Sequence, residues 1–293
     1  MSTTLTAAVH LDPTRKHDFV LLLDVRDGNP NGDPDAGGMP RIDSETMHGL
    51  ITDVAIKRKI RNTVPLLAKG RLGYDIYVEA GVALEAQQER AYREAQLSRD
   101  AKDAEAEAQR WMCQHFFDVR MFGAVMSVGA LHAGRTQGPV QLTFLRSIDP
   151  IVPMENGITR VTQTRQADID KGESTEMGSK HTVPYGLYQG YGHFSAPLAA
   201  RTGVTSDDLD VFWTAVLNML EHDRSATRGE MALRGLYVFT HDDAFGRAPA
   251  QALFDLVRVR RTSQGPARCF QDYAVEVDDQ ALPAGVTLTR LAG

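Results

Sequence analysis

Asp18-Phe-Val-Leu-Leu-Leu-Asp-Val-Arg-Asp-Gly-Asn-Pro-Asn-Gly-Asp-Pro-Asp35 is the stretch of sequence that decides the fold. It joins an apolar run, which extends from His17 to Val25, to a loop rich in Asn, Gly, Pro and Asp. A short apolar run bounded by turn-forming residues is typical of a buried strand. The sequence therefore predicts a strand that leaves the core into a long loop.

A basic helix is predicted after this loop. Apolar residues recur at helical spacing between Leu50 and Val64, and we expect the helix to end at Pro65. Four cations fall within five positions of this helix: Lys57, Arg58, Lys59 and Arg61. Because Lys57 and Arg61 are four residues apart, they share one helix face, which suits successive phosphates. An ordinary solvated helix face is the alternative.

A second basic stretch lies near the end of the chain and holds Arg258, Arg260, Arg261 and Arg268. No acidic residue interrupts it, although the whole chain carries a formal net charge of −6. Either stretch could be a solvated face, but together they suggest a groove that tracks phosphates. A protein coated all round with positive charge is excluded.

The remaining chain predicts an α+β core with insertions, organised as one elaborated domain over residues 1–293. An Ala- and Glu-rich helical insertion is expected over about 84–118, and a protruding hairpin over about 155–191 with a polar tip at 171–180. Further strands are expected over 74–78, 139–146, 234–240, 253–261 and 270–277, and a helix from Ser206 that buries Trp213.

Composition excludes several classes of protein. The 293 residues are 42% hydrophobic and 24% charged, close to globular averages, so a disordered or fibrous protein is excluded. The longest aliphatic run, Phe19 to Leu23, is far shorter than the roughly 20 residues that cross a bilayer. With no secretory leader at the N-terminus, we expect a cytoplasmic protein with no membrane partner. Cys113 and Cys269 are expected to be buried, reduced thiols.

Evidence for enzyme chemistry in the sequence is weak. Four carboxylates around the first loop, Asp24, Asp27, Asp33 and Asp35, are candidates for a magnesium site, but tight turns require the same residue types. An EF-hand is disfavoured because Gly38 stands where a bidentate Glu belongs. Arg234-Gly-Leu-Tyr-Val-Phe weakly matches the first ribonucleoprotein signature, with Leu where an aromatic residue is usual.

The first strand and its loop, with several later blocks, closely resemble one family. These blocks are Arg41–Asp43, Gly49–Val54, Lys57–Asn62, Phe122–Met126, Gly138–Leu142, Met177–His181, Val183–Tyr188, Glu221–Ser225 and Leu253–Val257. The family is that of the Cas7 backbone proteins of type I-C Cascade, also called Csd2. The resemblance covers nearly the whole chain, and the first-strand block and the Val-Pro-Tyr-Gly-Leu-Tyr segment are its most specific parts.

The resemblance implies a modified RNA-recognition-motif (ferredoxin-like) palm with helical finger insertions and a thumb hairpin. It implies a non-enzymatic, cofactor-free subunit that polymerises head to tail along CRISPR RNA. The guide is then presented for pairing with target DNA in antiviral defence. The implied partners are Cas5, Cas8 and the small subunits of Cascade, and a helicase-nuclease recruited by the complex.

The resemblance also implies particular site residues. Lys57 and Arg61 bind the guide backbone, with Arg58 and Lys59 as neighbours. Met177 and Lys180 belong to the thumb, which displaces one base at regular intervals, with His181 and Thr182 as supports.

Two alternatives remain open. The first is a magnesium-dependent ribonuclease that uses Asp33 and Asp35 of the Asp-rich loop after the first strand, because related type III subunits cleave RNA with an aspartate of this loop. The second is an assembly protein that polymerises without nucleic acid.

Overall fold

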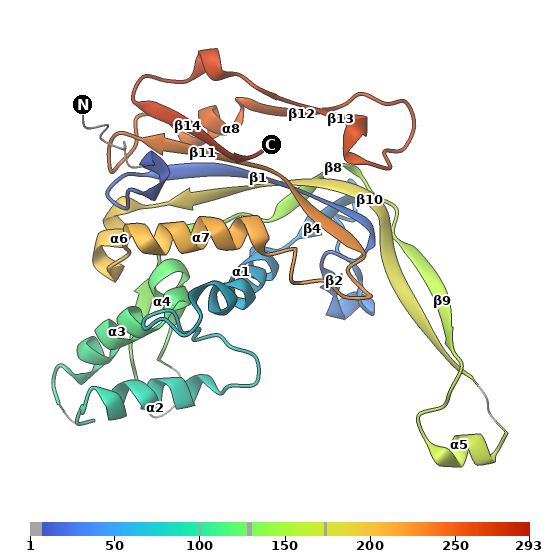
Figure 1. The fold of residues 1–293 in the computed structure, drawn as a ribbon, viewed down its shortest axis with the longest axis horizontal. Coiled ribbons are helices and arrows are strands. Elements are labelled where there is room, and N and C mark those ends of the chain that lie inside the picture. The colour runs from blue at the N-terminus through green and yellow to red at the C-terminus, as the bar shows by residue number, and fades with distance from the viewer. Residues whose placement is uncertain (1–7, 100, 128–130, 173–174) are drawn as a thin grey trace.

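A long antiparallel sheet forms the centre of the molecule. The computed structural model describes residues 8–99, 101–127, 131–172 and 175–293. Within these residues the sheet has the strand order β14-β11-β1-β10-β8-β4, and β7 and β9 also pair with β10 (Figure 1). The strands are β1 (His17–Gly28), β4 (His48–Ile51), β7 (Val140–Leu142), β8 (Leu145–Pro150), β9 (Met154–Arg160), β10 (Glu176–Phe194), β11 (Glu230–His241) and β14 (Val286–Ala292).

Strand β1 is the centre of this sheet, as its apolar sequence predicts. It pairs with β10 on one side and β11 on the other, both antiparallel. Phe19, Leu21 and Leu23 belong to one hydrophobic core, whereas Val20 and Leu22 belong to another. A strand that is covered on both faces needs apolar residues at every position, which explains the continuous run.

Two helices cover one face of the sheet: α1 (Asp53–Ala68) and α7 (Ser206–Asn218) (Figure 1). Helix α7 begins with a capping box in which Thr205 and Asp208 satisfy each other's backbone N–H groups. Trp213 is buried, as predicted, and packs edge-on against Phe19 at 5.1 Å between ring centroids.

The predicted limits of the basic helix are wrong at both ends. Residues 48–51 pair with β8 as strand β4, so the helix begins only at Asp53. Pro65 lies inside α1, which continues to Ala68. Proline removes one helical hydrogen bond. Here the turn is held because Val64 is fully buried and the Lys69 N–H donates to the Pro65 carbonyl at 3.1 Å.

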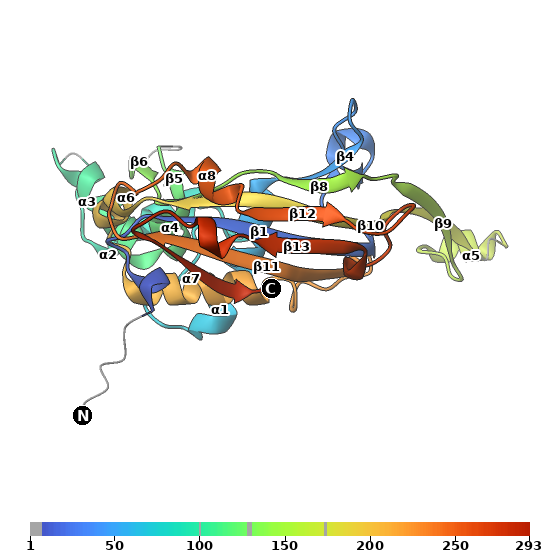
Figure 2. The same ribbon diagram turned by 90° about the horizontal axis from the view of Figure 1, so that it is seen from above.

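The other face of the sheet is covered by α8 (Ala250–Phe254) and a ribbon of β12 (Val257–Arg261) and β13 (Tyr273–Val277). Figure 2 shows this ribbon running over the sheet. The strand predicted over 253–261 is wrong in its first part, because a helical turn places Leu253 and Phe254 in the core beside Val20.

Other strand predictions also need correction. Residues 74–78 form no strand and make only an isolated bridge between Asp75 and Phe116. The stretch 139–146 is divided between β7 and β8, because β10 pairs with each of them separately. Strand β14 has no counterpart in the sequence prediction.

The shorter elements are β2 (Gly32–Asp33), β3 (Met39–Pro40), β5 (Gly123–Val125), β6 (Arg135–Gln137) and α6 (Ala196–Thr202), with 3-10 turns at Val9–Leu11, Pro34–Ala36, Phe270–Asp272 and Asp279–Ala281.

A helical lobe lies below the sheet in Figure 1, where the helical insertion is expected. It contains α2 (Leu84–Glu94), α3 (Ala104–His115) and α4 (Phe117–Phe122). The lobe has a hydrophobic core of its own, to which Tyr77, Ala91 and Met112 contribute. Among the described residues no helix has both the length and the apolar character needed to cross a bilayer.

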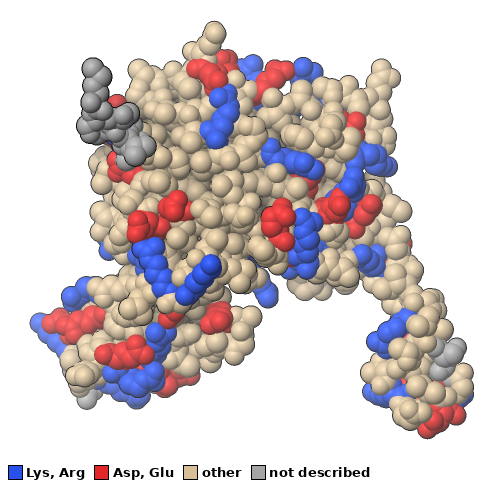
Figure 3. Space-filling model, in the orientation of Figure 1, with Lys and Arg blue, Asp and Glu red and all other residues tan. Residues whose placement is uncertain are grey.

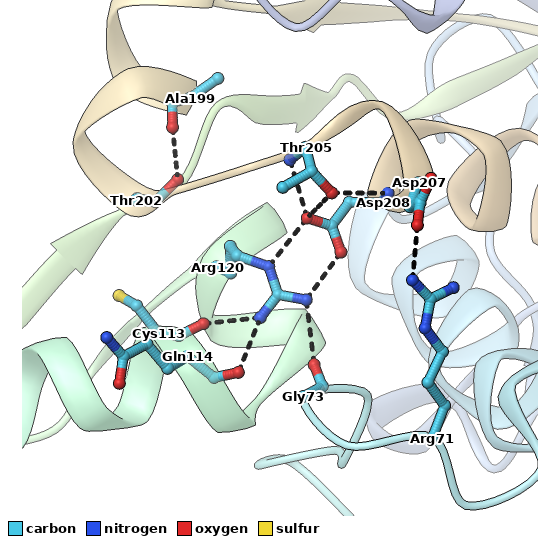
Figure 4. A network of polar contacts seen from close by, with 10 residues as sticks. All are labelled: Arg71, Gly73, Cys113, Gln114, Arg120, Ala199, Thr202, Thr205, Asp207 and Asp208. Atoms are coloured by element: carbon cyan, nitrogen blue, oxygen red, sulfur yellow. Dashed lines mark hydrogen bonds and ion pairs between the residues drawn. The ribbon is translucent and has the colours of Figure 1, made fainter.

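Arg120 of α4 joins the helical lobe to the helices below the sheet (Figure 4). Its guanidinium donates to the Asp208 carboxylate of α7 at 2.7 Å and to the carbonyl oxygens of Cys113 and Gly73 at 2.6 and 2.9 Å. Because both charged side chains are buried, the ion pair fixes the lobe against α7.

A hairpin projects from the sheet where β10 continues beyond its edge (Figure 1). Residues 154–160 pair with 176–182 in a continuous register. The described part of the tip includes α5 (Gln166–Asp170). The tip predicted at 171–180 is therefore misplaced, and residues 173 and 174 of that stretch lie outside the described residues. Apart from Met177, residues 176–180 lack large apolar side chains, as suits a strand whose two faces are both largely exposed.

Candidate nucleic-acid interface

A cleft of about 880 Å³ lies beside the N-terminal half of α1. Its walls come from the loop after β1, from α1, from residues 78–80 and from the loop 223–228. The space-filling view shows the helical lobe and the hairpin as two projections from one side of the body, with Lys and Arg side chains along the edge between them (Figure 3). We refer to this cleft as the basic cleft.

Positive charge dominates the lining of the basic cleft. Its cations are Arg41, Arg58, Lys59, Arg61 and Arg228, and its carboxylates are Glu79 and Asp223. The N-terminus of α1 opens into the same wall, where Thr52 and Ala55 line the cleft. A helix N-terminus adds a partial positive charge, so both sources of potential favour an anion.

The loop after β1 is tied to the start of α1. The Thr52 N–H and hydroxyl both donate to the Asn31 side-chain oxygen at 2.9 Å, and the Asn29 amide donates to the Gly38 carbonyl at 2.7 Å. Asn and Gly residues are therefore needed here for turn geometry and side-chain hydrogen bonds. This anchoring holds the loop against the helix N-terminus as one wall of the basic cleft.

The opposite wall depends on a close approach at Gly28. A Cβ atom at this position would lie 1.8 Å from the Arg228 carbonyl oxygen, so only glycine lets the loop 223–228 pack against the end of β1. The Asn29 N–H donates to the Thr227 carbonyl at 2.8 Å and fixes the approach. Arg228 is thus positioned in the cleft by backbone contacts to residues 28 and 29, which do not belong to the basic helix.

Lys57 and Arg61 share a helix face, as predicted, but that face is mostly buried. Both cations lie over the Phe122 ring, at 5.8 and 5.3 Å from its centroid. Lys57 Nζ lies 3.0 Å from the Asp53 carboxylate and donates to Gln141 at 3.3 Å, and Lys57 is not among the cleft-lining residues. Arg61 does line the cleft, and its Nε donates to the buried Asp118 at 2.8 Å.

Lys59 and Arg58 differ in their surroundings although they are adjacent. The Lys59 side chain is 3% exposed and forms an ion pair with Asp223, which also lies 2.6 Å from Arg228. Burial lowers the pKa of the Lys59 ammonium, and the Asp223 carboxylate opposes that shift. Arg58 is exposed in the cleft, and the described residues place no carboxylate within ion-pair distance of it.

The predicted thumb residues lie on the projecting hairpin and not in the basic cleft. Met177 is 81% exposed, and His181 follows it on the same face because strand side chains alternate. Lys180 lies on the other face, opposite Asn156 in the register of the hairpin. The structure thus separates Met177 from Lys180. Thr182 is buried and accepts a hydrogen bond from Asn156 at 3.3 Å.

The four loop carboxylates do not converge on one point. Asp24 is buried on the other face of the sheet, where it accepts hydrogen bonds from Tyr185 and Arg234. Asp33 accepts from the Asp35 N–H at 3.1 Å, and so holds the turn itself. Within the described ranges no group of three or more His, Cys, Asp or Glu side chains is placed to hold a metal ion.

Arg41 and Arg228 are cleft residues that the sequence reasoning missed. Each stands alone among neutral or acidic neighbours, so neither belongs to a run of charge. The Glu221–Ser225 block, two residues before Thr227, was the nearest sequence indication of this wall. Only the packing of that loop against Gly28 brings Arg228 to Lys59.

The fold and the cleft define an α+β protein with a cationic cleft at a helix N-terminus. The chain belongs to the family described as CRISPR-associated protein Cas7, whose family model matches residues 15–278. A curated relative, the CRISPR-associated protein Cas7 of Haloferax volcanii strain DS2, is 25% identical over 233 residues. The match covers 69% of this chain and only 64% of the relative.

Two solved structures also contain similar chains, at 15% sequence identity and over 76% of this chain. One is described as a CRISPR RNA-guided surveillance complex, pre-nicking, with a TM-score of 0.48 and 75% of that chain covered. The other is described as a CRISPR RNA-guided surveillance complex, with a TM-score of 0.46 and 68% covered.

Proposed function

We propose that this protein is the CRISPR RNA-binding backbone subunit of a type I-C interference complex. Copies polymerise along the guide RNA and present it for pairing with target DNA. The observation that carries the proposal is the basic cleft, where five cations face two carboxylates beside a helix N-terminus. Family membership supports the same function.

The topology supports the ferredoxin-like palm. The order of elements β1-α1-β8-β10-α7-β11 folds into four neighbouring strands, β11-β1-β10-β8, all antiparallel, with α1 and α7 against one face. This order of strands and helices is the one expected of a split βαβ module, which supports a palm of the RNA-recognition type. In this interpretation the helical lobe supplies the fingers, and the hairpin of β9 and β10 supplies the thumb.

The cleft residues divide into two roles. Arg58 is exposed, and Arg228 is partly exposed although it shares Asp223 with Lys59, so these two arginines contact the guide phosphates directly. Lys59 and Arg61 are largely engaged with Asp223 and Asp118, so they contribute mainly to the potential and hold the walls. Lys57, outside the cleft, supports α1 against α4. Contacts to phosphates leave the base edges free for pairing.

On the hairpin, Met177 has the exposed apolar side chain required to separate two stacked bases. In this proposal Lys180, on the other face, contacts a phosphate, and His181 and Thr182 support the strand. Head-to-tail copies, Cas5, Cas8, the small subunits and a recruited helicase-nuclease complete the proposed assembly. The ribonuclease alternative is not favoured, because Asp33 holds a turn and pairs with Arg41.

The experiment compares two variants that each lose two arginines. The chain is co-expressed with Cas5 and a matching CRISPR array, as the wild type, as R58A/R228A and as R258A/R260A. The last pair is exposed on β12, on the other side of the sheet. We expect R58A/R228A to weaken RNA binding by about tenfold or more, the equivalent of about 1.4 kcal/mol. R258A/R260A should bind like the wild type.

Equal RNA content and particle size for all three proteins, by absorbance ratio and elution volume, would contradict the cleft assignment. RNA-free particles of filament size that persist after ribonuclease would support an assembly protein instead. Cleavage of the guide that is lost in D33N/D35N would restore the ribonuclease alternative.

A further inference from the structure

A second arginine-lined pocket, of about 360 Å³, lies on the face of the sheet opposite α1 and α7. Its arginines are Arg26, Arg224 and Arg234. Phe270 and Cys269 from the turn before β13 form another part of the wall, so Cys269 is only partly buried and not a fully buried thiol as the sequence predicts. A volume of this size is at the lower end of the range of small-ligand sites, about 300–1,000 Å³.

The pocket forms where the polar ends of β1, β10 and β11 extend beyond α8 and β12, which cover the rest of this face of the sheet. On this face of β1, Val20 and Leu22 are buried under α8 and β12. Asp24 and Arg26 continue the same row, since alternate strand residues share a face. Arg26 pairs in register with Tyr185 of β10 and with Glu230 of β11, so polar groups of three strands meet there.

Arg234 is held as a flat platform inside this pocket. Its Nε donates to the buried Asp24 carboxylate at 2.8 Å, and its guanidinium lies 5.2 Å from the centroid of the Phe270 ring. Tyr185 donates its hydroxyl proton to the same carboxylate at 2.9 Å. The described residues make no hydrogen bond to the two terminal nitrogens of Arg234. A guanidinium plane fixed in this way is a stacking surface for a nucleobase.

The other two arginines are held only by exposed ion pairs. Arg26 pairs with Glu230 and Arg224 with Glu221, and all four side chains are more than half exposed. Exposed pairs of this kind contribute little to stability, so a phosphate competes with them readily. The pocket therefore combines one fixed stacking platform with two available guanidinium groups.

We propose that this pocket binds a single nucleoside phosphate, with its base stacked on Arg234 and its phosphate on Arg26 and Arg224. Arg234 is the first residue of the ribonucleoprotein-like stretch Arg234-Gly-Leu-Tyr-Val-Phe, which the basic cleft does not use. Arg224 precedes Ser225, which lines the basic cleft, so the loop 223–228 separates the two sites. The pocket is a site distinct from the guide-binding cleft and does not depend on it.

The test uses 2-aminopurine, whose fluorescence is quenched on stacking. Two probes distinguish the source of the nucleotide: 2-aminopurine riboside 5′-monophosphate, and a hexaribonucleotide with 2-aminopurine at one central position. The purified full chain is titrated with each probe as the wild type, Arg234→Lys, Phe270→Leu and the cleft variant R58A/R228A. Arg234→Lys keeps a positive charge beside Asp24 but removes the planar guanidinium group. Phe270→Leu keeps an apolar side chain next to Arg234 but removes the aromatic ring that supports the guanidinium.

Saturable quenching is expected for the wild type and for R58A/R228A. Because stacking contributes roughly 1–3 kcal/mol per base, we expect Arg234→Lys to weaken binding by about 5-fold to 150-fold. Phe270→Leu should weaken it in the same direction. Quenching of the monophosphate identifies a free nucleotide as a ligand, and quenching of the hexanucleotide alone identifies one unit of a strand.

Absence of quenching with both probes would overturn the proposal. It would also be overturned if R58A/R228A lost the quenching while Arg234→Lys kept it, because the probe would then be bound in the basic cleft. Loss of guide binding by R58A/R228A in the co-expression experiment tests the cleft separately, so the two assignments can fail independently.

Discussion

The two basic stretches of this chain contain the same number of cations, but the fold largely buries most of the cations of the first stretch and leaves those of the second more exposed. On α1, Lys57, Lys59 and Arg61 pair with carboxylates, and their side chains are 3–14% exposed. On the β12 ribbon, Arg260 and Arg261 pair with Glu276 and Asp149 while remaining 62% and 38% exposed. The helix supplies a wall of a cleft, whereas the ribbon crosses the outer face of the molecule (Figure 2).

The difference shows that a charge count does not identify a binding surface. A helix packed against a sheet and a neighbouring lobe turns part of its charged face inward, where each cation needs a carboxylate. Exposed Arg58 and partly exposed Arg228 line the concave wall of the cleft. The ribbon cations remain in water, where salt screens them.

The largest expected effect comes from breaking one ion pair in each stretch. Asp223→Asn leaves the buried Lys59 without its full counter-charge, and we expect the free energy of unfolding to fall by about 3–5 kcal/mol. Glu276→Gln removes an exposed partner of Arg260 and should cost less than about 1 kcal/mol. Urea unfolding of both variants measures the difference.

Among the described residues Asp223 forms ion pairs with Lys59 and with Arg228, and only the Lys59 side chain is buried. The double variant Asp223→Asn with Lys59→Met is therefore the control. It removes the buried charge together with its partner and should recover much of the loss. Equal destabilisation by Asp223→Asn and Glu276→Gln would erase the distinction between the two stretches.

A second, smaller effect is expected in the salt dependence of RNA binding. Each phosphate contact contributes about 0.7 to the slope of log affinity against log salt for a single strand. R58A and R228A should therefore each reduce the slope by about 0.7, and R258A should leave it unchanged. Fluorescence anisotropy of a labelled guide RNA between 50 and 200 mM salt, about the range in which such slopes are measured, gives the values. A lower slope for R258A would place the ribbon in the interface.

The smallest expected effect is a pH dependence of the unfolding free energy, which Lys59 of α1 should cause and the arginines of the β12 ribbon should not. Burial lowers the pKa of Lys59 below its ordinary value of 10.5, with Asp223 opposing the shift. The unfolded chain then holds this proton to higher pH, so the stability of the wild type relative to Lys59→Met rises as pH approaches 10.5. Arg260→Met is the control, because a guanidinium stays charged throughout.

Unfolding free energies from urea titrations at several pH values between neutral and 10.5 provide the measurement. If the unfolding free energy of the wild type relative to Lys59→Met fell as pH rose, the effect of Asp223 on the Lys59 pKa would exceed that of burial.

Much of the core could be predicted from local pattern. The strand at His17 and the helix that buries Trp213 are predicted because every apolar side chain in them has a place in the core. Residues 74–78 and 253–261 were misread because alternation over a few residues also fits a bridge or a helical turn. The hairpin tip was misplaced because an exposed strand has the composition of a loop.

The candidate site was predictable only in part. Arg58, Lys59 and Arg61 do line the basic cleft, since a helix brings neighbours in sequence together. Arg41 and Arg228 join them through contacts that span the chain, for example the approach of Arg228 to Gly28. Met177 and Lys180 looked like one group in sequence, but the alternation of a strand places them on opposite faces.

The sequence by itself determined the central buried strand, the helix-forming stretches and the family to which the chain belongs. These depend on periodicity and on short blocks of residues, which are local properties. Only the tertiary structure decided which cations face solvent, because burial and pairing depend on distant segments such as Asp118 and Asp223. It also created the pocket around Arg234, since that site requires three strands and the turn at Phe270 to meet.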